Sequence, residues 1–268
     1  MTCSRCYLLF FAVAIISCNQ PRYVYTQSAR NLHFFQDKGQ AKVSGAWTTG
    51  PSRGVYGDED SYNNGVDLQA AYAFADKWAV SGSYMARKER DLIQTYDINR
   101  LVTDVKYKRK ALEIGVSYFT ILDRSNATYF HVDGGVGWGK DQIRELGRLD
   151  SLSRTRSYND RNLKLFAQPG LYTGAKAVRF GMGVRVQWAG YSDIKTDYTQ
   201  AEMELYNLAG LNKLFMIEPY LALRFGPTTL PWIKGEFQFS FTGTSNNYYV
   251  RGAILSFGLV IDPSEKAR

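Results

Sequence analysis

The sequence predicts an all-β protein: a closed, antiparallel, up-and-down transmembrane β-barrel of about 10 strands that follows an N-terminal targeting segment. Three observations predict this fold. Apolar and polar residues alternate with a period of two from Ala41 onward, as a strand with two different faces requires. Most of the expected strands run to about 10–14 residues, and a tilted strand needs about 9–11 to cross a bilayer. Long and short connections alternate along the chain.

Composition excludes two other classes of protein. The 268 residues are 45% hydrophobic with a mean hydropathy of −0.31, which excludes a bundle of membrane-spanning helices, since each needs about 20 apolar residues. With 19 Tyr and 15 Phe, the chain has too much aromatic surface to bury for a disordered protein. The net charge of +8 comes from basic residues dispersed among strands and loops, so we expect no nucleic-acid partner.

The first 17 residues read as a signal peptide. Arg5 provides the positive start, and the apolar run Tyr7–Ile16 is too short to span a bilayer as a helix. Ile15-Ile16-Ser17-Cys18 resembles the lipobox of bacterial lipoproteins. This resemblance implies that Cys18 becomes residue one of the mature chain and carries covalent acyl chains. The alternative is an ordinary secretory signal with an incidental cysteine.

Cysteine usage and the residue after Cys18 extend this interpretation. Cys3 and Cys6 lie in the removed segment, so we expect no disulfide and no thiolate metal site in the mature chain. Asn19 stands where the lipoprotein family uses Asp to retain proteins at the inner membrane, so the resemblance favours the outer membrane. No cofactor other than the acyl chains is expected.

The chain divides into four segments. Residues 1–17 are the lipoprotein signal peptide, 18–40 a lipidated polar tether, 41–262 the barrel and 263–268 a C-terminal tail. The expected partners are outer-membrane lipids and the bacterial machineries that insert barrels and sort lipoproteins. An even number of strands would place both ends of the barrel on the periplasmic side, together with the lipid on Cys18.

Ten strands are expected from the pattern. They are Ala41–Thr49, Gly65–Phe74, Trp78–Glu89, Lys110–Leu122, Thr128–Lys140, Arg161–Thr173, Val178–Tyr191, Lys213–Gly226, Trp232–Thr242 and Tyr248–Ile261. Four of the connections have 14 to 21 residues and alternate with connections of three to five. A final connection at Gly243–Asn247 would be the one short outer loop. Short periplasmic turns and long extracellular loops are typical of outer-membrane barrels.

One face of each strand is apolar, and the other carries charges of both signs. Length, loop asymmetry and the export signal together favour the apolar face outside, against lipid. The lumen would then hold a network of paired charges whose members are Asp67, Arg87, Glu113, His131, Asp133, Lys164, Arg179, Arg185, Glu218, Arg224, Lys234 and Glu236. We expect Glu113, Glu218 and Glu236 to have Arg or Lys partners, because an isolated buried charge is costly.

Two prolines interrupt expected strands. Proline removes a ladder donor and is mostly confined to edge strands or bulges. Pro169 and Pro219 therefore predict local bulges.

The combination of these features resembles the uncharacterised outer-membrane β-barrel lipoproteins of Bacteroidota-type bacteria. The lipobox at Cys18, the entry segment Phe34–Gly45, the hairpin Gly65–Val80 and the two proline-containing strands carry the resemblance. It implies no activity. The last strand, which ends at Ile261, resembles the strand signal read by the barrel-insertion machinery, although residues follow it.

Four functional hypotheses remain open from the sequence. The first is a non-enzymatic lipid-anchored barrel with a structural or loop-based interaction role, including contact with anionic lipopolysaccharide or phospholipid headgroups. The second is a narrow pore. The third is a membrane-embedded hydrolase that uses His131 and Asp133, although the expected topology places His131 near the periplasmic turn. The fourth is a soluble periplasmic lipid-binding barrel tethered by Cys18.

Overall fold

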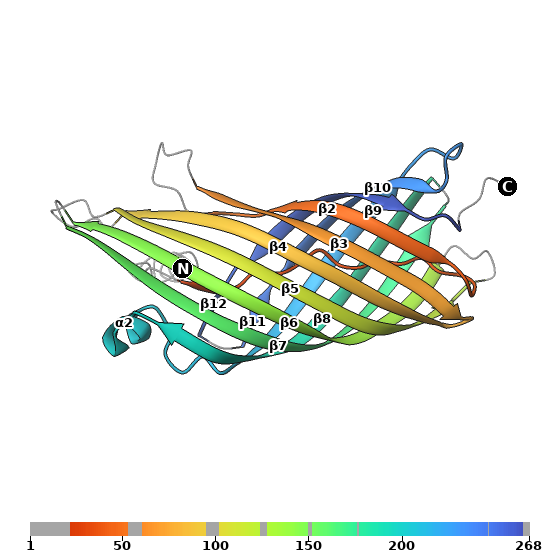
Figure 1. Cartoon of the computed structure of the whole chain (residues 1–268). Helices are drawn as coiled ribbons and strands as arrows, with labels where there is room; N and C mark the ends of the chain where they lie inside the picture. The colour runs from red at the N-terminus through yellow and green to blue at the C-terminus, as the bar shows by residue number, and fades with distance from the viewer. Residues whose placement is uncertain are drawn as a thin grey trace, which may run out of the picture.

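The computed structural model describes residues 22–52, 61–94, 102–123, 128–149, 152–175, 177–245 and 247–264. It confirms the closed antiparallel barrel of ten strands (Figure 1). In barrel order the strands are β2 (Ala41–Thr49), β3 (Tyr62–Ala75), β4 (Trp78–Gln94), β5 (Val102–Ile121), β6 (Thr128–Leu149), β7 (Leu152–Gly174), β8 (Val178–Thr196), β9 (Lys213–Phe225), β10 (Ile233–Phe241) and β13 (Ala253–Ile261). The signal peptide and Cys18 lie outside the described residues.

The barrel closes because its first and last strands pair. Val43 to Thr49 of β2 lie opposite Ile261 to Leu255 of β13, and every other barrel strand pairs with its neighbour in sequence. Closure leaves no sheet edge to expose unpaired backbone groups to lipid. Three short strands complete the set: β11 (Gly243–Thr244) adds to the wall by pairing with β9, whereas β1 (Tyr23–Tyr25) and β12 (Tyr249–Val250) pair with each other in a separate two-stranded sheet. Among the described residues, one short helix, α2 (Gln200–Leu205), lies in the connection before β9. No described helix has the length and apolarity needed to cross a membrane.

The two faces of the wall lie as expected. Apolar side chains on the outer face are about half exposed, for example Leu68 at 57%, Ile114 at 50% and Phe180 at 56%. Charged side chains on the inner face are buried. A soluble barrel has the opposite arrangement, so the hypothesis of a soluble periplasmic lipid-binding barrel is wrong. The exposed apolar belt is the surface of a protein that crosses a bilayer.

Several strands are much longer than expected. The structure extends the wall through most of residues 90–109, 141–160 and 192–196, which were expected to be loops. These residues were expected to be loops because the outward side chains change from apolar to polar along each strand. In β5, Glu113 faces inward and Leu112 outward, whereas further along Tyr107 is buried inside and Lys108 is exposed. The outer face of the extended wall is therefore polar, and its interior holds apolar side chains together with buried ions.

The apolar interior of this extension forms one cluster. Val24 and Tyr25 of β1 pack there with Tyr107, Ile143 and Leu208. Because the long connections and the extended strands share this end, it is the extracellular end of the barrel, and the short turns mark the periplasmic end. The final outer connection is also longer than expected, because β13 begins at Ala253 rather than at Tyr248.

The expected bulges at the two prolines are absent. Val184 of β8 lies opposite Pro219, and the register of β8 with β9 is the same on both sides of that pair. Pro169 pairs with Val132 in an unbroken β6–β7 register, and the β7–β8 register is unchanged across it. Each proline therefore removes one donor from the ladder without inserting an extra residue.

The N-terminal segment runs through the lumen. Residues expected to form a polar tether are buried along most of the way from Arg22 to Phe35, where Arg22 is 0% exposed and Leu32 is 0% exposed. The backbone enters β2 at the periplasmic end, and β1 pairs with β12 in the outer connection between β10 and β13. The polar residues of this segment, which have no clear periodicity, match a charged lumen rather than solvent.

Candidate functional site

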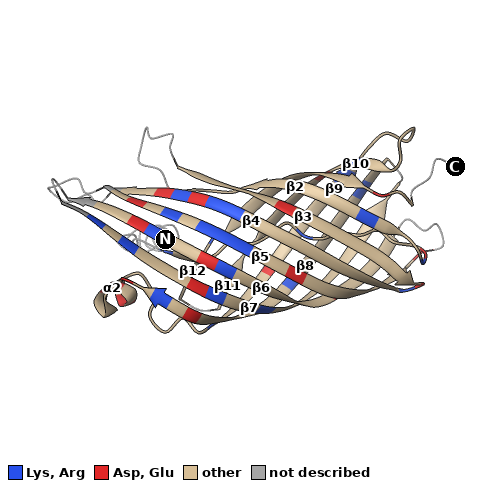
Figure 2. Cartoon of the chain, viewed as in Figure 1, with Lys and Arg blue, Asp and Glu red and all other residues tan. Residues whose placement is uncertain are grey.

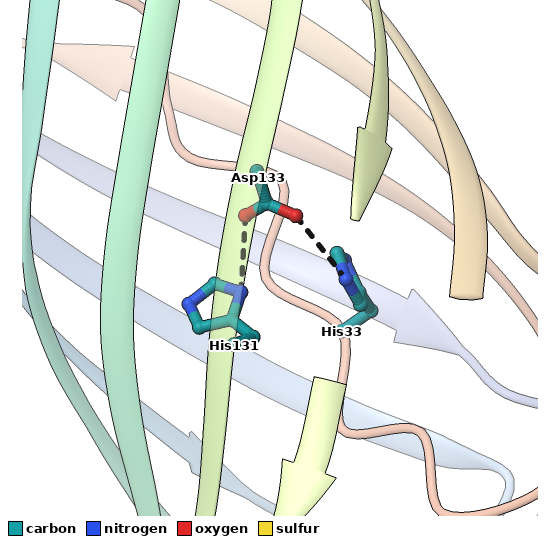
Figure 3. A group of neighbouring side chains, drawn as sticks. All are labelled: His33, His131 and Asp133. Atoms are coloured by element: carbon teal, nitrogen blue, oxygen red, sulfur yellow. Dashed lines mark ion pairs between the residues drawn. The ribbon is translucent and has the colours of Figure 1, made fainter. Parts of the chain in front are cut away.

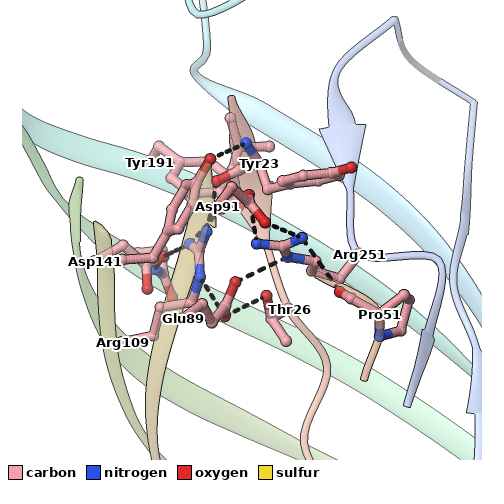
Figure 4. Close-up of polar contacts among 12 residues, drawn as sticks. Tyr23, Thr26, Pro51, Glu89, Asp91, Arg109, Asp141, Tyr191 and Arg251 are labelled. Carbon is pink, nitrogen blue, oxygen red and sulfur yellow. Dashed lines mark hydrogen bonds and ion pairs between the residues drawn. The ribbon is translucent and has the colours of Figure 1, made fainter. Parts of the chain in front are cut away.

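The plugged lumen is the candidate functional site, and its outermost layer is a cluster of buried ions (Figure 4). Glu89 accepts hydrogen bonds from Arg109 Nε at 3.2 Å, Arg251 Nε at 2.9 Å and the Thr26 hydroxyl at 2.7 Å. Arg251 also donates to both oxygens of Asp91, at 3.2 and 2.8 Å. One carboxylate on the wall thus connects the N-terminal segment to the last outer connection.

The middle layer holds the segment by a second buried ion pair. Arg30 Nη2 lies 2.8 Å from Glu218 Oε2, and both side chains are fully buried. Arg30 also exchanges backbone hydrogen bonds with the Gln238 side chain, at 2.7 and 2.8 Å. Asp67 accepts from the Ala29 amide at 3.2 Å. The segment is therefore fixed by wall residues that lie on several different strands.

The innermost layer lies toward the short turns. The Leu32 carbonyl accepts from Lys42 Nζ at 2.6 Å and from Arg224 Nη2 at 2.8 Å. The Arg224 guanidinium lies 4.3 Å from the centre of the Phe34 ring and also pairs with Glu236 at 2.5 Å. The segment thus contacts cations of the wall through a backbone carbonyl that accepts their hydrogen bonds and through the face of an aromatic ring.

All twelve lumen residues named from the sequence are buried inside the barrel. Their exposed fractions run from 0% for Glu218 to 7% for Arg179 and Glu236. The three glutamates have the cationic partners that were expected: Glu113 pairs with Arg185 at 2.8 Å, Glu236 with Arg224, and Glu218 with Arg30. Arg87 pairs with Asp67 at 3.0 Å.

Sequence reasoning missed other buried ions of the same network. They are Arg22, Arg30, His33, Lys42, Glu89, Asp91, Arg109, Asp141, Glu145, Asp160 and Arg251. Most of the missed wall residues lie on parts of strands that were expected to be loops, and those on the segment lay in the expected tether. The period of two continues through Glu89, Asp91, Arg109 and Asp141, and that signal could have found them.

Two histidines converge on one carboxylate in the lumen (Figure 3). His33 Nε2 of the segment lies 3.3 Å from Asp133 Oδ1, and His131 Nδ1 of β6 lies 3.0 Å from Asp133 Oδ2. One ligand atom from each residue falls within 4.8 Å of the others. Two imidazoles and a carboxylate are ligands that Zn²⁺ accepts, so these residues could hold a transition metal. No metal site was expected from the sequence, because the chain has only two histidines and one cysteine after the signal peptide.

The lumen has little room beside the segment. A cavity of about 20 Å³ lies between Ala29 and the wall and is lined by Glu113, Gln168 and Arg185 among others. That volume holds about one water molecule. Gly170 lies against the His131 ring and the Tyr220 hydroxyl, so that a methyl group there would overlap both. The segment is therefore closely packed against the wall at these positions.

No family model matches the chain, and no curated protein matches its sequence. Solved structures with a similar fold are outer-membrane proteins. The translocator domain of the autotransporter NalP from Neisseria meningitidis is 11% identical with a TM-score of 0.46, covering 84% of this chain and 88% of that chain. The outer membrane protein OprG from Pseudomonas aeruginosa is 12% identical with a TM-score of 0.38, covering 85% and 98%. Ail of Yersinia pestis is 11% identical with a TM-score of 0.33, covering 84% and 97%.

Proposed function

We propose that this chain is a non-enzymatic, non-conducting outer-membrane β-barrel lipoprotein that acts as an interaction protein at the cell surface. The observation that supports this function is the segment Arg22–Phe35, which fills the lumen and is tied to the wall by buried ion pairs. A lumen occupied in this way does not pass solutes, so the hypothesis of a narrow pore is the weaker one. The extended outer wall, capped by α2 and the outer connections, is then the surface available for partners.

Planar bilayer recording tests the plugged state. The full-length protein should give no stepwise conductance. A variant with Arg22→Ala and Arg30→Ala removes the segment's ion pairs with Glu145 and Glu218, and it should give intermittent openings. The matched control Arg154→Ala removes an exposed arginine and should stay silent. Steady conductance from the unaltered protein would refute the proposal and support the pore.

The geometry also bears on the side of the membrane that holds the lipid. Arg22 Nε lies 2.8 Å from Glu145 Oε2, near the outer tip of β6. Cys18 precedes Arg22 by four residues, which span at most about 14 Å. From Glu145 to the inner end of β6 at Thr128 the strand makes 17 residue-to-residue steps, about 56 Å along its length. We therefore place the acyl chains on Cys18 at the extracellular side, in place of the periplasmic side expected from the strand count.

Accessibility of an epitope in intact cells tests this placement. A tag inserted between Gln20 and Pro21 should bind antibody without permeabilisation. A control tag in the turn at Asp76–Lys77 should bind only after the outer membrane is opened. Lipidation is measured separately, by a mass increase of the mature chain that is lost in Cys18→Ser. A tag before Arg22 that behaves like the periplasmic control would overturn the extracellular placement.

The absence of an enzymatic role is part of the same proposal. His131 and Asp133 are 1% and 4% exposed, and the N-terminal segment lies over them. A general base must come within hydrogen-bond reach of a substrate proton, and the packed segment leaves no path for a substrate. Purified protein should show the same hydrolysis of lipids and peptides as the His131→Ala variant. Activity that His131→Ala abolishes would establish the hydrolase instead.

A further inference from the structure

A group of lysines lies just outside the apolar belt on the extracellular side. On β4, β5 and β6 the outward side chains change from apolar to basic within one step of the strand repeat: Ala86 to Lys88, Leu112 to Lys110 and Trp138 to Lys140. Lys108 lies one step further along β5. We call Lys88, Lys108, Lys110 and Lys140 the basic belt. Figure 2 shows Lys and Arg gathered on this part of the wall.

The basic belt places like charges directly opposite one another. Lys88 is paired with Lys108 across the β4–β5 ladder, and Lys110 with Lys140 across the β5–β6 ladder. Like charges in facing positions destabilise a sheet. Within the described ranges, no carboxylate forms an ion pair with any of the four lysines, whereas Asp104 is paired with Arg90 and Lys106. The sheet therefore bears an electrostatic cost that a bound anion would remove.

The depth of the basic belt identifies the anion. The belt begins where the lipid-facing side chains end, which is the level of the headgroups of the outer leaflet. Next to it, a groove of about 470 Å³ is lined by the apolar side chains of Trp47, Val66 and Ala86 and by Lys88, Lys108 and Lys110, and it also touches Arg87 and Arg109 of the wall. The groove thus offers apolar surface to an acyl chain and ammonium groups to phosphate on the same molecule.

From these observations we propose that the basic belt and its groove bind a phosphorylated glycolipid of the outer leaflet, of the lipid A class. The phosphates lie between the facing lysines. The acyl chains lie along the apolar side chains of the groove and continue onto the apolar belt of the barrel. The inference rests on the proposed outer-membrane placement and not on the plug, since the four lysines of the basic belt all lie on the outer face of the wall.

Binding in detergent tests the proposal. The full-length protein, refolded in a zwitterionic detergent, is examined by native mass spectrometry with diphosphoryl lipid A, its dephosphorylated counterpart and phosphatidylglycerol. Diphosphoryl lipid A should be retained about tenfold or more in preference to the other two. The variant with Lys→Gln at all four belt positions should lose this preference. A matched variant with Lys→Gln at Lys38, Lys77, Lys195 and Lys213, which are exposed elsewhere, should keep it.

A stability measurement separates a binding role from a structural one. Without lipid A, the belt variant should melt at a higher temperature than the unaltered protein, because the facing charges are gone. With saturating diphosphoryl lipid A the order should reverse. Equal retention of all three lipids by the unaltered protein, or equal losses in both variants, would overturn the proposal. Failure of the unaltered protein to fold into a heat-modifiable barrel would instead refute the membrane placement.

Discussion

Removing the Arg30 side chain should destabilise the barrel strongly, because it leaves a buried glutamate without its close partner. Arg30 and Glu218 are both fully buried and lie 2.8 Å apart. Breaking a buried ion pair from one side costs about 3–5 kcal/mol. Arg185 Nε remains 3.9 Å from Glu218, so partial compensation places the expected cost of Arg30→Met near the lower end, about 3 kcal/mol.

The double variant makes this prediction sharper. Replacing both partners, with Arg30→Met and Glu218→Leu, removes the orphaned charge and should recover most of the loss, since such replacements are often close to neutral. Urea unfolding in detergent, followed by tryptophan fluorescence, gives the free energy of unfolding for the two single variants and the double variant. A cost below about 1 kcal/mol for Arg30→Met would refute the reasoning, as would additive costs in the double variant.

Three further predictions concern packing, the lipid face and the outer helix. Gly170→Ala should lower the free energy of unfolding by about 1–3 kcal/mol in urea titrations, because the new methyl overlaps the buried His131 ring. Leu221→Lys, at an outward position that is 57% exposed, should lower the free energy of unfolding in lipid vesicles by about 2–4 kcal/mol. A lysine introduced at an outward position of the extended outer wall should cost much less. Partial burial opposes ionisation of Glu202, but the capping hydrogen bonds with Thr199 outweigh it and hold the pKa below its ordinary value. The α2 cap should therefore be present near neutral pH and lost on acidification through that lowered pKa, as read from amide chemical shifts.

The barrel could be predicted because its physical demands repeat on every strand. A lipid-facing wall needs alternation and a minimum strand length, and both are visible in Val178–Tyr191 and Lys213–Gly226. The orientation of the strands, with the apolar face toward lipid and the charged face toward the lumen, followed from the same demand for a lipid-facing wall. The outer extension was not predicted, since the outer face of its strands changes from apolar to polar while the inner face mixes apolar side chains with ions. A charged stretch such as Arg90–Arg109 looks like a solvated loop when it is read alone.

The plug could not be predicted for a different reason. A chain inside a closed lumen needs no periodicity of its own, because its neighbours on all sides are set by the wall. Arg30 and His33 therefore look like surface residues until Glu218 and Asp133 are seen around them. Half of the candidate site, the lumen charges of the wall, was accessible from alternation, whereas their partners on the segment required the structure.

Cross-linking between the plug and the two faces of one strand tests the central claim most directly. Leu32 packs in one buried cluster with Ala222 of β9, and the neighbouring Leu221 points to the outside at 57% exposure. A short membrane-permeant bis-maleimide, applied to intact outer membranes, should join Leu32→Cys to Ala222→Cys, with the linked peptides identified by mass spectrometry. The paired control Leu32→Cys with Leu221→Cys should give no such product. Cross-linking of the Leu221 pair, or of neither pair, would contradict a barrel whose own N-terminal segment fills its lumen.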